Sequence, residues 1–347
     1  MSEPSTDDIT TSDSLCEDVV LSSRARLARN VAEVPFVHRC STEQRRDIMA
    51  RVLPALDTDT ASEPTTWIDL ESATSLQRRL LFEQHLISRQ HADAKGPRAV
   101  AVSVDELLSV MVNEEDHVRM HAMAPGLQPG VCFERIRAFD TAIEPCVGWA
   151  FHERWGYQSA CATNTGTGIR FSAMLHLPAL RITRELEKVR QAAKDLHLAV
   201  RGYYGEGSES SGNFYQVSNQ ITLGCSEEEL LDRFVNTIVP GIIEYERSAR
   251  QVLLRRNRIA MEDRIDRDLA ILCSAKLLKV DEAMRRLSSV RLGRCLDIVK
   301  TPSLQVINSL FQEIQAGHLQ HAAGEKLSPE QSQAARAELV RSQIGHH

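Results

Sequence analysis

The chain has 347 residues, a length that predicts one large domain with a smaller appendage, or two domains. Hydrophobic residues make up 42% and charged residues 25%, which is typical of a globular protein and not of a disordered or fibrous one. The formal net charge of -6 argues against a general nucleic-acid binder, although local arginine clusters can still bind anions. The N-terminal sequence is acidic and polar, and no run of about 18 apolar residues follows, so we expect neither secretion nor membrane insertion.

Cysteine and histidine are placed without a metal or disulfide pattern. The eight cysteines are spread along the chain with no CxxC pair, which predicts reduced thiols in the cytoplasm. None of the twelve histidines belongs to an HExxH motif, and the HxxH of His318 and His321 is more often an exposed helix face than a metal site. We therefore expect no metal held by protein ligands.

The N-terminal third predicts a tail, helices and the first strand. Residues 1–18 are rich in Ser, Thr, Asp and Glu, and we expect a disordered tail there. Ser41 and Gln44 form a capping box that predicts a helix to about Leu56. The segment TWIDL then predicts a short strand, and residues 75–85 a second helix.

The middle of the chain is rich in β-strand signals. The segments AVAVSV and LLSVMV are followed by a polar break at 113–117 and by the alternating segment VRMHAM, which predicts a hairpin with a charged turn. A helix is expected around Val131 to Ile143. Residues 168–177 alternate again, so four side chains share one face of a strand: Arg170, Ser172, Met174 and His176.

Further along, helical spacing over 182–196 predicts a helix, and the strand LAVRGYY leads into a glycine-rich loop at 205–212. Residues 215–223 alternate as in a half-buried strand. Ser226 with Glu229 predicts the start of a long helix.

Strand signals end at about Arg250, which divides the chain into two parts. We expect an α+β catalytic domain over 19–250, with an antiparallel sheet flanked by helices. A small all-helical domain is expected over 251–347.

Three polar clusters fall at strand ends or in loops, where functional groups are commonly mounted. The first is SSRAR, residues 22–26, in which Arg24 and Arg26 alternate along an extended segment and point to the same side. Two guanidinium groups on one face can bind an anion. On spacing alone, a solvated basic stretch is the commoner explanation.

The second cluster is NEEDHVR, residues 113–119, in which Glu114 and Glu115 share a turn with an aspartate, a histidine and an arginine. Like charges this close raise pKa values, so one carboxylate is a candidate base. An exposed acidic turn is the alternative.

The third cluster combines Arg170, Arg201 and Glu206, the last within the glycine-rich RGYYGEGSE. Glycine lets backbone amides approach phosphate oxygens. There is no GxxxxGK[ST] motif, so a Walker-type NTPase is not supported, and a flexible loop without function is the alternative. Together the clusters indicate a site for a polyphosphate and a cationic acceptor.

The motifs SSRAR, NEEDHVR, CATNTGTGIR and RGYYGEGSE, in this order, resemble the phosphagen (guanidino) kinase family. The resemblance is closest to the bacterial protein-arginine kinase branch, through VVLSSRARLARN, HLIS, MLHLPAL, SNQITLG, ERSAR and VRLG. It implies a glutamine synthetase-like catalytic domain. Small-molecule phosphagen kinases carry a helical domain of about a hundred residues before SSRxR. Only 21 residues precede that motif here, so we expect an open acceptor site suited to arginine on a protein surface.

The resemblance also implies roles for individual residues. Glu115 would be the catalytic carboxylate with Glu114 beside it, Glu206 a second carboxylate that grips the guanidinium, and Cys161 the reactive cysteine, for which a buried inert thiol is the alternative. ATP, with Mg²⁺ bridging its phosphates, would be clamped by arginines with His85 beside the nucleotide. The implied nucleotide-binding residues are Ser22, Ser23, Arg24, Ala25, Arg26, His85, Arg119, Arg170, Phe171, Ser172, Ala173, Met174, Arg201, Gly202, Tyr203, Tyr204, Gly205 and Glu206.

Two departures from the family pattern have consequences. Ala162 replaces the proline of CP[ST]N, which we expect to loosen the turn that holds Cys161. The branch's RDxxRA segment, a pocket for phosphorylated arginine, aligns with residues 332–337, where only Arg336 and Ala337 fit. We therefore do not expect phosphoarginine recognition by this segment.

The sequence thus predicts an ATP-dependent protein-arginine kinase acting in stress response and protein quality control. The expected partners are arginine-bearing substrate proteins, an activator protein, Clp-type protease components and a second copy in a homodimer. A small-molecule guanidino kinase is the alternative among enzymes. A non-catalytic adaptor that binds arginine or phosphoarginine is the alternative from another class.

Overall fold

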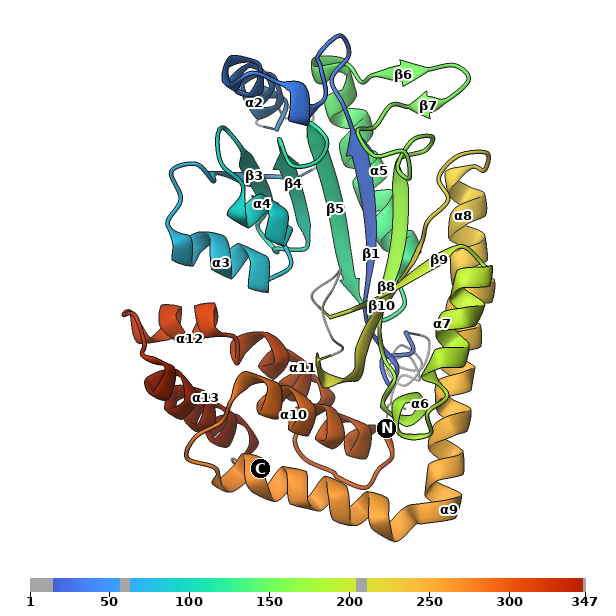
Figure 1. Ribbon diagram of the computed structural model, residues 1–347, viewed down its shortest axis with the longest axis vertical. Coiled ribbons are helices and arrows are strands. Elements are labelled where there is room, and N and C mark those ends of the chain that lie inside the picture. Colours follow the sequence, from blue (N-terminus) through green and yellow to red (C-terminus); the bar gives the residue numbers. More distant parts are fainter. Residues whose placement is uncertain (1–14, 57–62, 204–210, 346–347) are drawn as a thin grey trace, which may run out of the picture.

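The computed structural model describes residues 15–56, 63–203 and 211–345 (Figure 1). Within these residues one antiparallel sheet of eight strands has the order β2-β3-β4-β5-β1-β8-β10-β9. A separate hairpin, β6 with β7, lies beyond one end of it. The strands are β1 (Val20–Arg29), β2 (Thr65–Asp69), β3 (Ala99–Ser103), β4 (Leu108–Val112), β5 (Val118–Pro125), β6 (Phe151–His152), β7 (Gly156–Tyr157), β8 (Ile169–His176), β9 (Leu198–Gly202) and β10 (Phe214–Asn219).

Helices flank the sheet, and the elements described after β10 are all helices. The predicted fold class, an antiparallel sheet flanked by helices with a helical region after it, is confirmed. The helices are α2 (Thr42–Leu56), α3 (Ser75–Glu83), α4 (Arg89–Asp93), α5 (Pro129–Val147), α6 (Pro178–Ile182), α7 (Leu186–Asp195), α8 (Glu227–Arg233), α9 (Val239–Ser274), α10 (Val280–Cys295), α11 (Leu304–Glu313), α12 (Ala316–Ala323) and α13 (Pro329–Ile344).

Two element predictions were wrong in their extent. The strand predicted over 215–223 ends at Asn219, whose side-chain amide donates to the carbonyls of Ile169 and Ile221 and so turns the chain away from the ladder. The helix predicted over 182–196 is broken between α6 and α7, where Arg184 has a φ of +62° that a helix does not accommodate.

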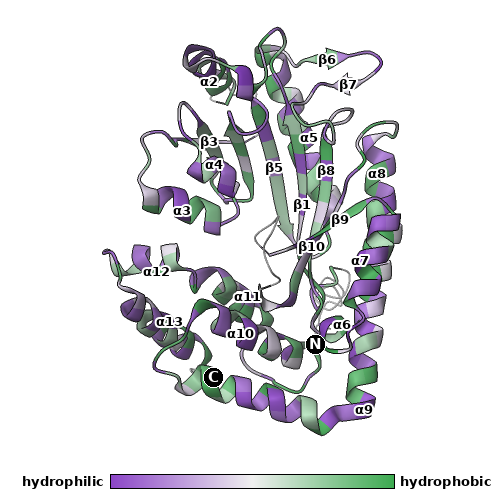
Figure 2. Ribbon diagram, in the orientation of Figure 1, coloured by the Kyte–Doolittle hydropathy of each residue, from purple (hydrophilic) through white to green (hydrophobic). Residues whose placement is uncertain are grey.

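The two faces of the sheet differ in character. Helix α5 packs on one face, where Phe133 meets Phe171 with ring centroids 5.6 Å apart. On the other face, α3 and α4 cover the β2 to β4 half through an apolar cluster that includes Leu81 and Leu86. The strands in Figure 2 are mostly green with purple residues interspersed, and α7 is mostly purple. The purple residues on β1, β5 and β8 include arginines on the face opposite α5, and these form the candidate site.

The C-terminal helices pack below the sheet and join it through one long helix. Helix α9 runs through residue 250 and bends at Asn257, which has φ -143° and ψ 41°. Phe214 of β10 and Phe311 of α11 meet with ring centroids 4.7 Å apart. The division at 250/251 therefore stays a prediction, since one helix crosses it. None of the described helices combines the length and apolar composition needed to cross a membrane.

The end of the predicted N-terminal tail is folded onto these helices. Asp18 accepts hydrogen bonds from Arg247 and Arg250, and Arg291 donates to the carbonyls of Glu17 and Asp18. Residues 15–18 are thus ordered by buried arginines, whereas 1–14 lie outside the described residues.

Candidate active site

The register of the central strands collects arginines on one face. Arg26 of β1 lies directly opposite Arg170 of β8 and His121 of β5. Arg24 is two residues before Arg26, and Arg119 two before His121, so both project to the same side. Like charges directly opposite in a sheet are destabilising, and a bound anion would offset that cost.

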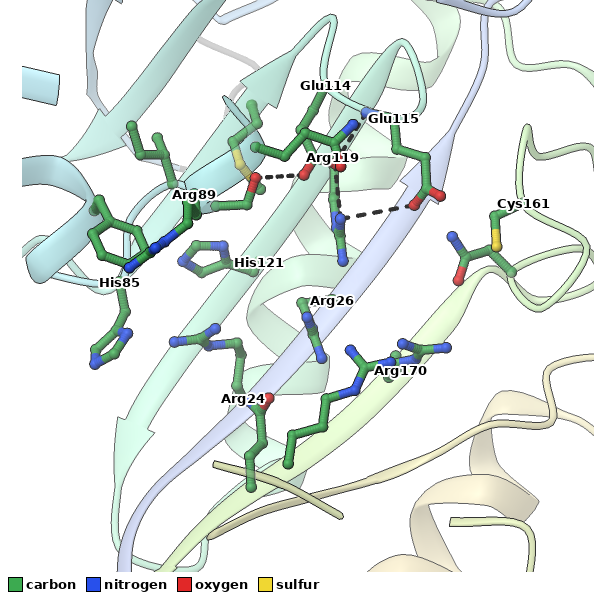
Figure 3. Close-up of a pocket in the computed structure, with 18 of the residues that line it drawn as sticks. Arg24, Arg26, His85, Arg89, Glu114, Glu115, Arg119, His121, Cys161 and Arg170 are labelled. Carbon is green, nitrogen blue, oxygen red and sulfur yellow. Dashed lines mark hydrogen bonds and ion pairs between the residues drawn. The ribbon is translucent and has the colours of Figure 1, made fainter. Parts of the chain in front are cut away.

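These side chains line a cavity of about 480 Å³. In Figure 3 the middle of the cavity is occupied by Arg24, Arg26, Arg119 and Arg170. His85 and Arg89 lie at one end, and Glu115 and Cys161 lie at the other. The lining residues are Arg24, Arg26, Phe82, His85, Ile87, Ser88, Arg89, Gln90, Met111, Glu114, Glu115, Arg119, His121, Cys161, Thr163, Asn164, Arg170, Met174, Arg201, Tyr203 and Gln216.

The arginines are buried beside one another, which lowers their pKa values. Burial, then repulsion from Arg119, lowers the pKa of Arg24 to about 10. Burial and the neighbouring arginines also lower the pKa of Arg26 and of Arg170. Among the described residues, Nε and Nη2 of Arg26 and Nε of Arg170 are buried without a hydrogen-bond partner. Such donors fit the oxygens of a polyphosphate.

Glu114 is buried and held in its ionised form. Its carboxylate accepts hydrogen bonds from Arg119 Nη1 at 2.8 Å, from Ser88 Oγ at 2.6 Å and from the Glu115 amide at 3.1 Å. Burial alone would raise its pKa, but Arg119 and these donors lower it to about 2. Glu114 therefore fixes Arg119 rather than exchanging protons.

Glu115 has the opposite environment. It is half-buried, and its Oε2 lies 4.0 Å from Arg119 Nη1, too far for a hydrogen bond. Burial, opposed in part by Arg119 and assisted by Asp116 and Glu114, raises its pKa. A partly exposed carboxylate with a raised pKa at the rim of a cationic cavity is suited to act as a general base.

Cys161 lies in a loop next to Glu115. Its Sγ is 3.1 Å from Thr163 Oγ1, and the side chain is half-buried at the cavity rim. The Asn164 amide donates to the Cys161 carbonyl at 2.9 Å, so the turn closes although Ala162 replaces the expected proline. The buried Asp116 accepts hydrogen bonds from Ser159 and from the Ala160 amide, which ties this loop to the Glu115 turn.

The opposite end of the cavity is aromatic. His85 and Tyr203 meet edge to face with ring centroids 5.2 Å apart. Burial, then Arg24, lowers the pKa of His85 to about 3, so this imidazole is neutral at ordinary pH. His121 is buried between the arginines with its pKa held well below the usual value by burial, so it adds no positive charge.

The residues implied by the family resemblance fall into three groups. Arg24, Arg26, His85, Glu114, Glu115, Arg119, Cys161, Arg170, Met174, Arg201 and Tyr203 line the cavity. Others contribute no side chain to its lining: Ser22, Ser23, Ala25, Phe171, Ser172, Ala173 and Gly202. Of these, Ala25, Phe171 and Ala173 pack in the apolar core on the α5 side. Tyr204, Gly205 and Glu206 lie outside the described residues.

Sequence reasoning missed several lining residues. Ser88 holds Glu114, His121 shares the arginine face, and Arg89 stacks over Phe82 at 5.3 Å. The alternation of VRMHAM placed His121 beside Arg119 on one face, a signal that was available. Ser88 is the last residue of the segment HLIS, but its contact with Glu114, 26 residues away, had no local signal.

The structure shows where Arg336 and the two histidines of the HxxH segment lie in the C-terminal helices. Arg336 is buried and donates to the carbonyls of Ile314 and Leu278, so its guanidinium is used within the helical region. His321 is exposed as predicted. His318 is not, because its side chain is half-buried against Glu83 with Nδ1 3.0 Å from Oε2.

Comparison with known proteins gives the same family that the motifs resemble. A model of the ATP:guanido phosphotransferase C-terminal catalytic domain matches residues 47–249, and one of the protein-arginine kinase McsB C-terminal domain matches 258–347. The chain is 39% identical over 327 residues to a protein-arginine kinase of Halothermothrix orenii, covering 94% of this chain and 93% of that protein. It is 41% identical over 329 residues to one of Brevibacillus brevis, covering 94% and 92%.

Solved structures agree at the level of the fold. A duplicated taurocyamine kinase of Schistosoma mansoni is 26% identical with a TM-score of 0.62, over 66% of this chain and 33% of that chain. This chain thus spans about a third of that duplicated protein. Lombricine kinase is 26% identical with a TM-score of 0.59, over 67% of each chain.

The site and the fold together define a guanidino phosphotransferase. The chain belongs to the ATP:guanido phosphotransferase family, in its protein-arginine kinase branch. Membership of this kinase family implies the use of ATP.

Proposed function

We propose that this protein transfers the γ-phosphoryl group of ATP to arginine side chains of other proteins. The observation that carries the proposal is the cavity itself, in which six arginines adjoin a carboxylate pair. Relatives of about 40% identity that are named protein-arginine kinases support the choice of acceptor.

In this proposal the arginines bind the phosphates. The unpartnered guanidinium nitrogens of Arg26 and Arg170 donate to phosphate oxygens, and the anion relieves the repulsion between the arginines. Fixed positive charge on the transferring group is the main means by which enzymes accelerate phosphoryl transfer. The neutral His85 and Tyr203 provide an aromatic end for the nucleotide base.

Magnesium is part of the proposal as a companion of ATP. The described residues contain no group of three or more His, Cys, Asp or Glu side chains placed to hold a metal ion. We therefore assign Mg²⁺ to the phosphate oxygens, where it supplies further charge neutralisation when bound.

Glu115 is the proposed base. A guanidinium has a pKa above about 12 and is a poor nucleophile until it loses a proton. The carboxylate of Glu115 accepts that proton as the new N–P bond forms, the bond from the γ-phosphorus to the bridging oxygen breaks, and ADP leaves. Glu114 keeps Arg119 in place, and Glu206 is proposed to grip the acceptor beside Glu115, although it lies outside the described residues.

The cellular setting is also a proposal. A cytoplasmic location fits eight free thiols and dependence on ATP. Roles in stress response and quality control, an activator protein, Clp-type protease partners and a homodimer follow from the branch that the sequence resembles.

The test is incubation of the purified chain with Mg-ATP and either an unfolded protein or free arginine. Products are kept out of acid and analysed by mass spectrometry for phosphoarginine. Phosphate on protein arginines is the expected result. Phosphate on free arginine alone would instead identify a small-molecule guanidino kinase. Absence of both products would favour an enzyme that depends on an activator protein, or an adaptor.

A further inference from the structure

One buried carboxylate near the site takes no part in the proposed chemistry. Glu83, at the end of α3, is 5% exposed. Its Oε1 accepts a hydrogen bond from the Gly317 amide at 2.9 Å and its Oε2 one from the His318 amide at 3.1 Å. His318 Nδ1 lies 3.0 Å from Oε2, and Arg79 Nε donates to Oε1 at 2.9 Å. Glu83 therefore caps the first turn of α12 from a position 234 residues earlier in the chain.

The fit around this cap is close. A Cβ atom on Gly317 would lie 2.6 Å from Glu83 Oε2 and 3.1 Å from Arg79 Cγ, so only glycine fits there without displacement. Burial alone would raise the pKa of Glu83, but His318, Gly317 and Arg79 lower it, so the carboxylate is ionised and bound on both oxygens. An ionised buried group that lost these donors would be costly, which makes the α3 to α12 contact specific.

The cap is attached directly to the active-site cavity. His85 follows Glu83 by two residues, in a turn with φ +60°, and meets Tyr203 at the aromatic end. Ser88 follows in the same segment and holds Glu114. Between them, the Leu86 carbonyl accepts from Ser109 Oγ. The four residues 85–88 therefore link α12 to the aromatic end of the cavity through His85 and to Glu114 through Ser88.

We propose that Glu83 is a positioning residue for nucleotide binding, through which the C-terminal helices hold the segment 85–88 in place. The inference rests on the proposed use of ATP in this cavity. Opening the cap lets the end of α3 shift and displaces His85, which weakens nucleotide binding without removing any group that touches the nucleotide. Coupling between separate sites typically changes an affinity by about 5- to 150-fold, and we expect about tenfold here.

The experiment measures the dissociation constant of ADP by calorimetry on the full-length chain, which needs no acceptor. Gly317→Ala forces the cap apart, and Gly241→Ala in α9 is its matched control, because a Cβ at Gly241 meets nothing within 4 Å. We expect Gly317→Ala to bind ADP about tenfold more weakly than the wild type. The control, Gly241→Ala, should bind ADP with unchanged affinity. Glu83→Gln should weaken binding similarly, since its amide would face a backbone donor.

A double variant separates a local effect from general destabilisation. If both substitutions act through the cap, Glu83→Gln with Gly317→Ala binds ADP no more weakly than Glu83→Gln alone. His318→Ala removes only one side-chain donor to Glu83, so it provides a milder test if the other variants do not fold. It should weaken ADP binding by a smaller factor. If the variants bind ADP like the wild type but melt at a lower temperature, the positioning role of Glu83 is overturned and the proposed function is not affected. A wild-type chain that does not bind ADP would overturn the proposed function as well.

Discussion

At the scale of residues, Glu114 and Glu115 are neighbours in sequence with opposite electrostatic environments. Glu114 is bound by Ser88 and Arg119, which lowers its pKa to about 2. Glu115 has only a longer ion pair with Arg119 and a hydrogen bond with Cys161, and burial raises its pKa. One carboxylate therefore serves to orient an arginine and leaves the other available for proton transfer.

The first prediction concerns this division. Glu115→Gln keeps the shape but cannot accept a proton, so turnover should fall about 10²- to 10⁴-fold. ADP affinity should change little, because Glu115 lies at the end of the cavity away from His85. Glu153→Gln, an exposed change in the β6–β7 turn, is the control. Full turnover by Glu115→Gln would remove Glu115 as the base.

A second prediction is the pH dependence of kcat/KM, followed through ADP release. The base must be ionised, and burial raises the pKa of Glu115, so activity is present above that pKa and lost as the pH falls through it. The acid limb should therefore lie above the ordinary glutamate value of about 4.3. In Glu115→Gln this limb should vanish; its persistence would assign it to another group.

Which site residues were predictable depended on how local their partners are. Alternation along β1 and β8 placed Arg24, Arg26 and Arg170 on one face, and the register then brought them together. The same alternation places Ala25 and Phe171 on the opposite face. They were included among the implied nucleotide-binding residues because whole motifs were carried over from the family. Ser88 depends on a partner across the fold, for which the sequence has no local signal.

At the scale of elements, the loop of Cys161 is tied to the Glu115 turn by one side chain. Asp116 accepts from Asn30 Nδ2 at 2.7 Å, from Ser159 Oγ and from the Ala160 amide at 2.7 Å. Since Asp116 is buried, these contacts fix the loop from beneath.

The third prediction is that Asp116→Ala frees this loop. Buried donors left without a partner cost about 1–3 kcal/mol each, so the loop should detach before the sheet unfolds. Alkylation of Cys161, followed peptide by peptide, should become faster while kcat falls. Asp116→Asn keeps one acceptor oxygen and should have a smaller effect. Unchanged alkylation in Asp116→Ala would show that the loop is held by other contacts.

Helix starts were predictable because they are set by contacts within four residues. The capping boxes at Ser41 and Ser226 form as predicted. The strand predicted over 215–223 was too long, because alternation continued past Asn219 after its side chain had ended the ladder. Alternation of polar and apolar residues indicates which side chains could share one face of a strand. Where the strand ends depends on whether a neighbouring strand is there to pair with it.

At the scale of the whole molecule, the helical region and the sheet share buried polar contacts. Arg291 of α10 is fully buried and donates to the carbonyls of Glu17 and Asp18 and to His176 Nδ1 of β8. Helix α9 spans both parts and bends at Asn257. The boundary near residue 250, predicted from the loss of strand signals, stays a prediction, and buried contacts cross it.

The fourth prediction follows from these contacts. The two parts should unfold in one transition in urea, and Arg291→Ala should lower the free energy of unfolding by about 3 kcal/mol, because several buried acceptors lose their donor. Arg285→Ala, on a less buried face of α10, is the control. Two separate transitions in the wild type would contradict the shared packing.

The central claim is transfer of phosphate to protein arginine with Glu115 as the base. The most direct measurement follows a labelled γ-phosphoryl group from ATP into an unfolded protein, comparing the wild type with Glu115→Gln at neutral or alkaline pH. We expect acid-labile label on arginine residues with the wild type and almost none with the variant. Label on hydroxyl side chains, or equal labelling by both proteins, would contradict it.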